Sequence, residues 1–404
     1  MNNLTILTCN YNTPQQVDNL LRSLKLTSSE LPKVVVMNTS TEDVCELPLQ
    51  LNSVPYYNVR GFSHGEEFRT PISELAEIRR GLMLAKNPAL LRKLDELALE
   101  QFELSRKFAP HLAFEIEGIA KGANLTLTDL VILNNYTDFR DISLPEEGCS
   151  TVHIQTPSEI LSGQTWDMHR SAKNYMCLIH VPPTESHTAQ LILTLVGCVG
   201  LMGVNTNNGL IGVNNINTTN AKTGLIWPVL VRKSLEASNL GEMRKTLFNA
   251  PVTSGHNYLI SSPDGGEHLE ITPSVSEKIS ALNRGQVGGI FHTNHCLGYE
   301  VEKLEDKSSM SSTTFNRYNL LSKKTHAVTN IKEFKNLLTD HDEFPKSICS
   351  HFENGAQDPS FTCGGGVSDL KTGTHIFWRG CPTHDQDYIE HEFKLEGLDF
   401  KKIK

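Results

Sequence analysis

The hydrophobic residues at the start of the chain follow two different patterns. Residues 4–9 and 33–37 are short β-prone runs, and each suits a buried strand. Between them, residues 15–25 place a valine and three leucines at helical spacing. A strand, a helix and a second strand in this order predict a small βαβ extension over residues 1–50, with a parallel pair of strands as its simplest topology.

Residues 51–148 have a mainly helical pattern. Residues 52–65, NSVPYYNVRGFSHG, are the exception, because they suit a strand that enters a glycine turn. Hydrophobic residues then recur at helical spacing, and Thr126 or Thr128 can cap the last predicted helix. The predicted helices cover residues 72–85, 89–108, 112–122 and 126–133.

The pattern changes again near Gly148. From Cys149 onward, short hydrophobic runs alternate with glycine and asparagine turns, which is typical of β-strands. The predicted strands cover residues 149–155, 159–166, 177–182, 190–196, 210–214, 256–261, 268–271, 289–292 and 374–378, and the predicted helices 225–236 and 243–248. Strands with helices before and among them indicate a layered α+β domain over residues 149–404.

Charge and length narrow the possible partners. The chain has 404 residues, with 37 basic and 46 acidic side chains and a formal net charge of -9. This balance gives no basic face for nucleic acid and no Lys/Arg run for an anionic membrane surface. The N-terminus lacks the features of an export signal, and no stretch has the ~18 apolar residues of a spanning helix. We therefore expect a cytoplasmic protein without a nucleic-acid or membrane partner.

The nine cysteines show no pairing in their spacing. An odd number without close pairs argues against a disulfide framework, and no CxxC pair is present to hold zinc. The sequence therefore predicts no metal, and most of the cysteines should be small buried residues. Cys149 differs from the others because it follows Gly148 where the strand-rich part begins.

A glycine before a strand-opening cysteine suits self-cleavage. Glycine tolerates the backbone angles of a strained peptide, and the thiol can attack the preceding carbonyl and move the acyl group from nitrogen to sulfur. Hydrolysis of the resulting ester frees a chain that begins with cysteine. Its α-amine, with an unperturbed pKa of about 7.7–8.0, can act as general base for its own thiol. Gly148 and Cys149 are thus the predicted cleavage site. The dipeptide alone also fits a buried structural cysteine.

Further motifs give Cys149 a context. They are GFSHGEEF at residues 61–68, EIEGIAKGANLTLTDLVILNNYTD at 115–138, EEGCST at 146–151, GQTWDM at 163–168, GVNTNNGLIGVNN at 203–215 and HTNH at 292–295. In this order and spacing, the chain from about residue 55 onward resembles the autoproteolytic acyl-coenzyme A:6-aminopenicillanic acid (isopenicillin N) acyltransferase family. The first 40 or so residues resemble instead the start of a family 2-type glycosyltransferase.

The acyltransferase resemblance implies roles for three catalytic residues. Cys149 is similar to the nucleophile of the family. Asp167 is similar to its active-site carboxylate, which would orient the α-amine or a polar group of the substrate. Asn294 is similar to the asparagine that stabilises the oxyanion. Without the resemblance, Asp167 better suits a turn cap at the end of a strand.

The same resemblance gives four candidate substrate-binding residues, each with a structural alternative. Trp166 can line the substrate pocket or serve as a core aromatic residue. Asn205 and Asn214 lie in a segment near the active site of the family, although asparagine also favours tight turns. His292 stands beside Asn294. Since carboxylate or cysteine partners at ligand spacing are lacking, His292 and His295 suit a structural role better than a metal site.

The resemblance also implies a fold and an activity. The fold is the four-layer αββα sandwich of Ntn hydrolases, in which fragments 1–148 and 149–404 stay together after cleavage. The activity is cleavage or transfer of an acyl group on an amide of a small peptide-like or N-acyl amino acid substrate, as in natural-product biosynthesis, through a thioester on Cys149. No cofactor is implied, although a coenzyme A thioester can be a co-substrate. The oligomeric state is not readable from the sequence.

One position departs from the family pattern. Near the C-terminus the family commonly has an ICRH-like segment, whereas this chain has ICSH, with Ser350 in the place of the arginine. Such an arginine could pair with a substrate carboxylate. Its replacement argues against a penicillin-like substrate, unless Arg284 or Arg379 supplies the charge.

Two alternative functions remain open at the level of sequence. One is nucleotide-sugar binding by the glycosyltransferase-like first segment, although the acidic DxD motif expected after further strands is not in place. The other is a processed but inactive binding protein, because the arginine position has changed.

Overall fold

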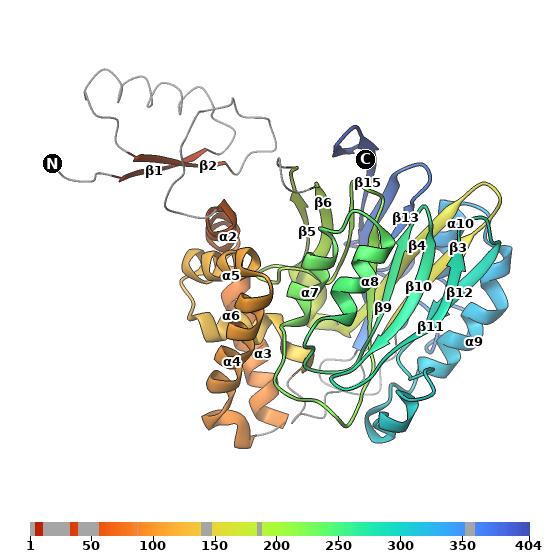
Figure 1. Ribbon diagram of the computed structural model, residues 1–404, viewed down its shortest axis with the longest axis horizontal. Helices are drawn as coiled ribbons and strands as arrows, with labels where there is room; N and C mark the ends of the chain where they lie inside the picture. Colours follow the sequence, from red (N-terminus) through yellow and green to blue (C-terminus); the bar gives the residue numbers. More distant parts are fainter. Residues whose placement is uncertain are drawn as a thin grey trace.

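The computed structural model of the chain describes residues 5–10, 33–38, 56–86, 88–138, 148–183, 188–351 and 360–404. Most of the described residues belong to two seven-stranded sheets and to the helices that pack against them (Figure 1). Short 3-10 helices connect these elements at Pro88–Arg92, Tyr136–Asp138, Arg170–Tyr175, Glu302–Leu304, Lys307–Ser309 and Thr325–Ala327.

The first sheet is a meander in chain order. Each strand pairs antiparallel with the next one along the chain, and the connection from β8 to β9 contains two helices. The strands are β5 (Met176–Val181), β6 (Gln190–Leu195), β7 (Met202–Asn205), β8 (Leu210–Asn215), β9 (His256–Ser262), β10 (Gly265–Ile271) and β11 (Ser276–Asn283).

The second sheet gathers strands from distant parts of the chain. Its order is β12 (Gly288–His292), β3 (Gly148–Gln155), β4 (Ile160–His169), β13 (Ser360–Asp369), β14 (Thr374–Arg379), β15 (Ile389–Glu396) and β16 (Asp399–Lys402). All of its pairings are antiparallel. Strand β3 therefore has a neighbour on each side, and every residue along it is buried.

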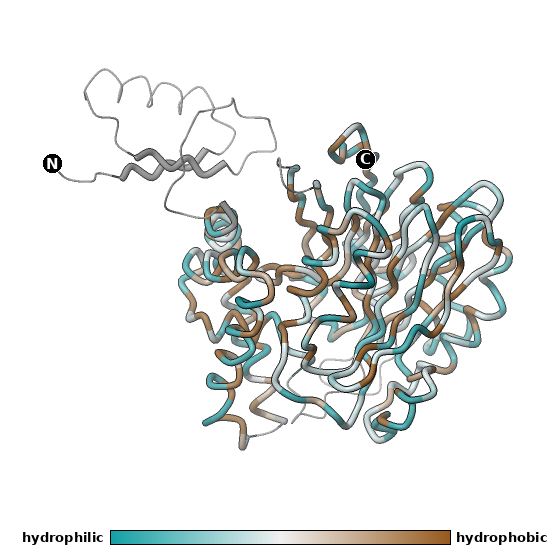
Figure 2. Tube along the Cα trace, in the orientation of Figure 1, coloured by the Kyte–Doolittle hydropathy of each residue, from teal (hydrophilic) through white to brown (hydrophobic). Residues whose placement is uncertain are grey.

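Helices cover the outer faces of both sheets. Helices α7 (Trp227–Ser234) and α8 (Leu240–Phe248) lie against the first sheet, and α9 (Thr314–Lys324) and α10 (Ile331–Leu338) lie against the second (Figure 1). These helices are amphipathic, and hydrophobic and hydrophilic residues alternate along them in Figure 2. The four layers confirm the predicted αββα sandwich and the α+β class.

The helical segment before the sandwich is also confirmed in most of its elements. The predicted helices correspond to α3 (Arg69–Lys86), α4 (Leu94–Phe108), α5 (Pro110–Ala123) and α6 (Leu127–Asn134). Thr126 is the N-cap of α6, and its hydroxyl accepts a hydrogen bond from the Asp129 backbone nitrogen.

The strand and glycine turn predicted within residues 52–65 are wrong for the described part, which forms helix α2 (Tyr56–Glu67). The glycines serve close helix packing instead of a turn. A Cβ on Gly61 or Gly65 would lie 2.1 or 2.2 Å from a backbone oxygen of α5, and Gly118 and Gly122 meet the backbone of α2 in the same way. Glycines four residues apart on both helices thus let the two backbones touch.

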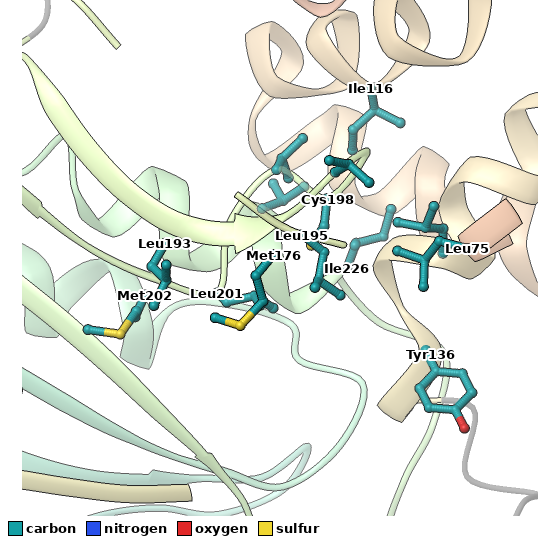
Figure 3. Packing of buried hydrophobic residues seen from close by; sticks show 14 of the residues in the cluster. Leu75, Ile116, Tyr136, Met176, Leu193, Leu195, Cys198, Leu201, Met202 and Ile226 are labelled. Atoms are coloured by element: carbon teal, nitrogen blue, oxygen red, sulfur yellow. The ribbon is translucent and has the colours of Figure 1, made fainter. Parts of the chain in front are cut away.

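The helical segment shares a hydrophobic core with the first sheet. Figure 3 shows Leu75 and Ile116, from α3 and α5, beside Leu195, Cys198 and Ile226. Since these residues come from before and after position 148 in the sequence, the core links the parts of the chain on either side of the predicted cleavage site. The predicted division at residues 50 and 148 stays a prediction.

The N-terminal strands pair as the sequence predicts. Strand β1 (Thr5–Asn10) and strand β2 (Lys33–Asn38) are parallel, with Thr5 opposite Lys33. The helix predicted between them lies outside the described residues. Among the described helices, none combines the length and the hydropathy that a membrane crossing requires.

Candidate active site

The register of strands β3 and β4 brings two of the predicted catalytic residues together. Gly148 lies opposite Asp167 and Cys149 opposite Trp166. On the other side of β3, strand β12 ends at His292, so Asn294 lies just beyond the strand end. Because β12, β3 and β4 are neighbours in one sheet, residues far apart in the sequence meet at the beginning of β3.

Side chains from three other segments hold the backbone of Cys149. Its nitrogen donates a hydrogen bond to Asn294 Oδ1 at 2.8 Å. Its carbonyl oxygen accepts hydrogen bonds from Arg317 Nη1 at 2.6 Å and from Asn214 Nδ2 at 2.9 Å. Cys149 is buried and lines a pocket. The position of this residue is therefore fixed on both sides of its Cα atom.

Asp167 explains why a glycine precedes Cys149. A Cβ at position 148 would lie 2.5 Å from Asp167 Oδ2 and 3.0 Å from Arg317 Nη2. The other carboxylate oxygen, Oδ1, accepts a hydrogen bond from Thr362 Oγ1 at 2.7 Å. Any side chain at position 148 would collide with a carboxylate that is itself held in place.

Burial is the largest influence on the pKa of the Asp167 carboxyl. Burial raises the pKa of the carboxyl above its ordinary value, although the charge of Arg317 and the hydrogen bond from Thr362 act in the opposite direction. Oδ2 is buried without a hydrogen-bond partner among the described residues. A carboxyl of this kind can give up or take a proton beside the Gly148–Cys149 peptide bond.

Arg317 is the residue of the site that the sequence did not reveal. It lies on α9, fully buried, and its Nη2 donates to Asn294 Oδ1 at 2.8 Å. Its Nε donates to Thr313 Oγ1 at 3.0 Å, and its Nη1 donates to Ser150 Oγ at 3.1 Å as well as to Cys149. The guanidinium therefore joins the residues that surround the start of β3.

The two arginines considered as substitutes for an arginine at position 350 lie elsewhere. Arg284 is exposed and pairs with Asp264 at 3.3 Å. Arg379 belongs to β14 and lines a different pocket, together with Phe377 and His391. Neither of them lines the pocket of Cys149.

The pocket at Cys149 has mainly apolar walls. Trp166, Met168, Leu201, Val213 and Trp227 contribute to them. The polar members of the lining include Asp167, Asn294 and Arg79, a buried cation that lies over the Tyr136 ring at 4.9 Å and donates to the Leu133 carbonyl oxygen. The pocket thus offers apolar surface to an apolar group beside the thiol, together with the polar side chains of Asp167, Asn294 and Arg79.

The four predicted substrate-binding residues separate into one at the pocket and three elsewhere. Trp166 lines the pocket. Asn214 is buried beneath Cys149 and bonds its carbonyl oxygen and the hydroxyl of Thr151. Asn205 organises the turn between β7 and β8, where its Oδ1 accepts from two backbone nitrogens. The structure therefore brings neither asparagine to the pocket lining.

His292 also lies outside the pocket lining. Its Nε2 contacts Glu270 Oε1 at 2.7 Å, and its Nδ1 lies 2.8 Å from the Thr293 carbonyl oxygen. Burial lowers the pKa of the neighbouring His295 to about 4, with a smaller contribution from His292. These interactions place both histidines in a buried polar network behind Asn294.

The fold and the site together define a class of protein. Two facing antiparallel sheets with helices on both outer faces (Figure 1) are the layered arrangement of Ntn hydrolases, which are enzymes that act on amide bonds. The comparison with known families agrees. The sequence model of the acyl-coenzyme A:6-aminopenicillanic acid acyl-transferase family matches residues 154–360, just over half of the chain. The chain belongs to this family.

Individual relatives are more distant. The chain is 26% identical over 300 residues to the 40 kDa form of the acyl-coenzyme A:6-aminopenicillanic-acid acyltransferase of Emericella nidulans, a match over 73% of this chain and 82% of the relative. A solved mutant of conjugated bile acid hydrolase from Clostridium perfringens has a TM-score of 0.40 and 11% identity, covering 63% of this chain and 96% of that one.

A second solved structure gives a similar result. The N-acylethanolamine-hydrolyzing acid amidase ortholog of Caenorhabditis elegans has a TM-score of 0.39 and 14% identity, over 55% of this chain and 93% of that one. Likenesses at this level do not bear on the chemistry. The resemblance of the first 40 residues to a glycosyltransferase gains no support from these findings.

Proposed function

We propose that the chain cuts itself between Gly148 and Cys149, and that Cys149 then acts as the nucleophile of an amidase or acyltransferase. The observation that carries this proposal is the environment of the peptide bond between them. Cys149 N is bonded to Asn294, and the carboxyl of Asp167 lies against Gly148. A group that can donate a proton and a group that can orient the nitrogen thus flank the bond that would break.

The cleavage follows from these positions. The Cys149 sulfur attacks the Gly148 carbonyl carbon, the C–N bond breaks, and Cys149 N gains the proton that the thiol loses. Asp167, whose pKa is raised by burial, can relay that proton. Water then hydrolyses the thioester, which leaves a carboxylate on Gly148 and a free thiol and α-amine on Cys149.

The same groups serve the mature enzyme. The α-amine, with an ordinary pKa of about 7.7–8.0, takes the proton of the thiol as the sulfur attacks the carbonyl carbon of the substrate amide. It passes this proton to the leaving amine, and the acyl group stays on sulfur as a thioester. Asn294 donates a hydrogen bond to Asn215 O through its Nδ2 and can direct a second amide hydrogen to the oxyanion. Such a donor typically contributes about 2.7–4 kcal/mol.

The pocket favours an N-acyl substrate with an apolar acyl group. Its apolar walls suit the acyl part, and Arg79 in the lining suits a polar or anionic group of the substrate. Small peptide-like compounds and N-acyl amino acids meet both requirements. The acceptor is water in an amidase and an amine in an acyltransferase, for which a coenzyme A thioester can also be the donor.

Mass spectrometry tests the proposal directly. The purified chain should give fragments 1–148 and 149–404 under denaturing conditions, and Cys149→Ala should remain one chain of 45.0 kDa. A panel of N-acyl amino acids and acyl thioesters, with and without an added amine, then separates hydrolysis from transfer. Turnover by a wild-type chain that stays uncut would overturn the role of the α-amine.

A further inference from the structure

Four potential metal ligands meet in a cluster outside the lining of the Cys149 pocket. They are His341, Cys349, His351 and Cys381, and their ligand atoms all lie within 4.8 Å of one another. His341 follows α10, Cys349 and His351 precede β13, and Cys381 follows β14. The fold therefore gathers them from two connections, three from the one between α10 and β13 and one from the one after β14, at one end of the second sheet.

The spacing of the four ligand atoms fits a tetrahedral ion. Zinc binds thiolate sulfur at about 2.3 Å and imidazole nitrogen at about 2.0–2.1 Å. A tetrahedron of these ligands therefore has edges of roughly 3.3 Å between nitrogens and roughly 3.6 Å between nitrogen and sulfur. Nε2 of His341 lies 3.2 Å from Nε2 of His351 and 3.3 Å from Sγ of Cys381, and Cys349 Sγ lies 3.5 Å from His351 Nε2.

The surroundings of the four ligands support the same geometry. Both cysteines are free and buried, and both histidines are half-buried. The Thr383 nitrogen donates to Cys381 Sγ at 3.4 Å, so a backbone donor already faces the sulfur. A cavity of about 410 Å³ that includes His351 and His384 in its lining gives an ion a path to the cluster.

We propose that His341, Cys349, His351 and Cys381 bind one zinc ion. Two thiolates and two imidazoles are a known structural set for zinc, and four protein ligands leave no position for substrate. The site is therefore structural. It departs from the prediction of no metal, which rested on the absence of a CxxC pair, because these ligands are not arranged as two such pairs in the sequence.

The metal site is connected to the active site through Ser350. This residue lies between two of the ligands, Cys349 and His351. Its backbone nitrogen donates a hydrogen bond to Thr362 Oγ1 at 2.8 Å. Thr362 N donates in turn to the Ser350 carbonyl oxygen at 2.8 Å, and Thr362 Oγ1 donates to Asp167 Oδ1 at 2.7 Å. The zinc ion thus fixes the segment that positions Asp167.

Metal analysis of the full-length protein tests this proposal without reference to activity. Elemental analysis should find about one zinc per chain, in the wild type and in uncut Cys149→Ala alike. Cys381→Ser and His341→Ala should each weaken zinc binding at least about 100-fold. Matched controls are Cys177→Ser, on β5, and His384→Gln, whose ring packs against His341 without belonging to the four ligands. Both controls should keep the metal.

A spectroscopic measurement covers the case in which a ligand variant does not fold. Co²⁺ added to wild-type protein after chelation of zinc should give the visible bands of tetrahedral cobalt with thiolate ligands. The proposal is overturned if the wild type binds neither zinc nor Co²⁺, if both ligand variants keep full zinc content, or if non-reducing mass spectrometry finds a Cys349–Cys381 disulfide in the freshly purified protein. Since Cys149→Ala serves in the same assays, failure of self-cleavage leaves this result unaffected.

Discussion

Replacing Gly148 by alanine should slow self-cleavage. The added Cβ would lie 2.5 Å from Asp167 Oδ2 and 3.0 Å from Arg317 Nη2, and other hydrogen bonds hold both side chains in place. Overpacking of this kind typically costs about 1–3 kcal/mol. The uncut chain carries this cost, and because crowding increases when the thiol adds to the Gly148 carbonyl, we expect a further cost of similar size in the transition state. The expected loss of rate is about 5- to 150-fold.

The assay separates strain from loss of chemistry. The rate comes from the appearance of fragment 149–404 by mass spectrometry, and the strain comes from urea denaturation of Gly148→Ala in the uncut Cys149→Ala background. The matched control is Gly81→Ala on α3, where a Cβ has no neighbour within 4 Å. It should leave the cleavage rate unchanged and raise stability by about 0.5–1 kcal/mol.

Two outcomes would refute the reasoning about Gly148. Faster cleavage of Gly148→Ala would mean that strain in the uncut chain drives the reaction, and that the crowding around the added Cβ is relieved in the transition state. An unchanged unfolding free energy in the Cys149→Ala background would mean that the Asp167 carboxylate moves aside without cost. The double variant Gly148→Ala, Asp167→Ala should recover part of the lost stability but not cleavage, because it removes the closer of the two contacts together with the carboxyl.

Three further predictions follow from the buried polar groups. Asn294→Ala should lower kcat/KM about 10²- to 10³-fold in steady-state kinetics, and a loss confined to KM would contradict an oxyanion role. Burial raises the pKa of Asp167 above 3.8, so the folded state binds this proton more tightly than the unfolded state does. The resulting contribution to folding stability is fully present below pH 3.8 and is lost as the pH rises through the raised pKa. In urea denaturation of the Cys149→Ala chain, the variant that also carries Asp167→Asn should therefore become more stable relative to the chain with Asp167 as the pH rises through that range. A difference in unfolding free energy that does not change with pH would exclude this linkage. Burial lowers the pKa of His153 from 6.5 to about 3, so the melting temperature should fall as the pH drops below 6.5, with a shallower fall in His153→Gln as the check.

Hydrophobic periodicity predicted the elements that have a clean pattern. The long helices before position 148 and strands such as β3, β6 and β9 lie close to their predicted positions. Strand β13 was not predicted, because its centre is Gly364-Gly365-Gly366, which has little strand propensity. Tertiary packing requires these glycines: a Cβ on Gly365 would lie 2.5 Å from Gln164 O, and one on Gly366 would lie 2.6 Å from the Phe377 ring.

The same cause explains the error at helix α2. Glycines in a single sequence indicate either a turn or a close approach of backbones, and only the partner helix decides between them. Gly61 and Gly65 could be read as a helix contact only together with Gly118 and Gly122, more than fifty residues later. Local pattern carries no information about which distant segments meet.

The catalytic candidates and the metal candidates differ in how far the sequence could reveal them. The Gly-Cys dipeptide and the family motifs identified Cys149, Asp167 and Asn294, and the strand order explains why these three residues meet. The cluster around His341 has no local motif beyond the Cys349–His351 pair. His341 precedes this pair in the same connection between α10 and β13, and Cys381 comes from the connection after β14, which only the folded second sheet brings close.

Arg317 and Ser350 show how a correct observation about sequence can concern the wrong position. The sequence drew attention to the missing arginine at position 350, yet Ser350 is bonded through its backbone to Thr362 and lies behind Asp167. The cation that bonds Cys149 is Arg317, which the pattern of α9 presents as one more basic residue of an amphipathic helix. A fully buried guanidinium requires anionic or carbonyl partners. The role of Arg317 is therefore set by its partners at the start of β3 and at Asn294, and its neighbours in the sequence do not reveal it. Charge at the active site thus belongs to the scaffold that holds Cys149, and a substrate carboxylate, if present, must find its partner elsewhere in the pocket, where Arg79 is the candidate.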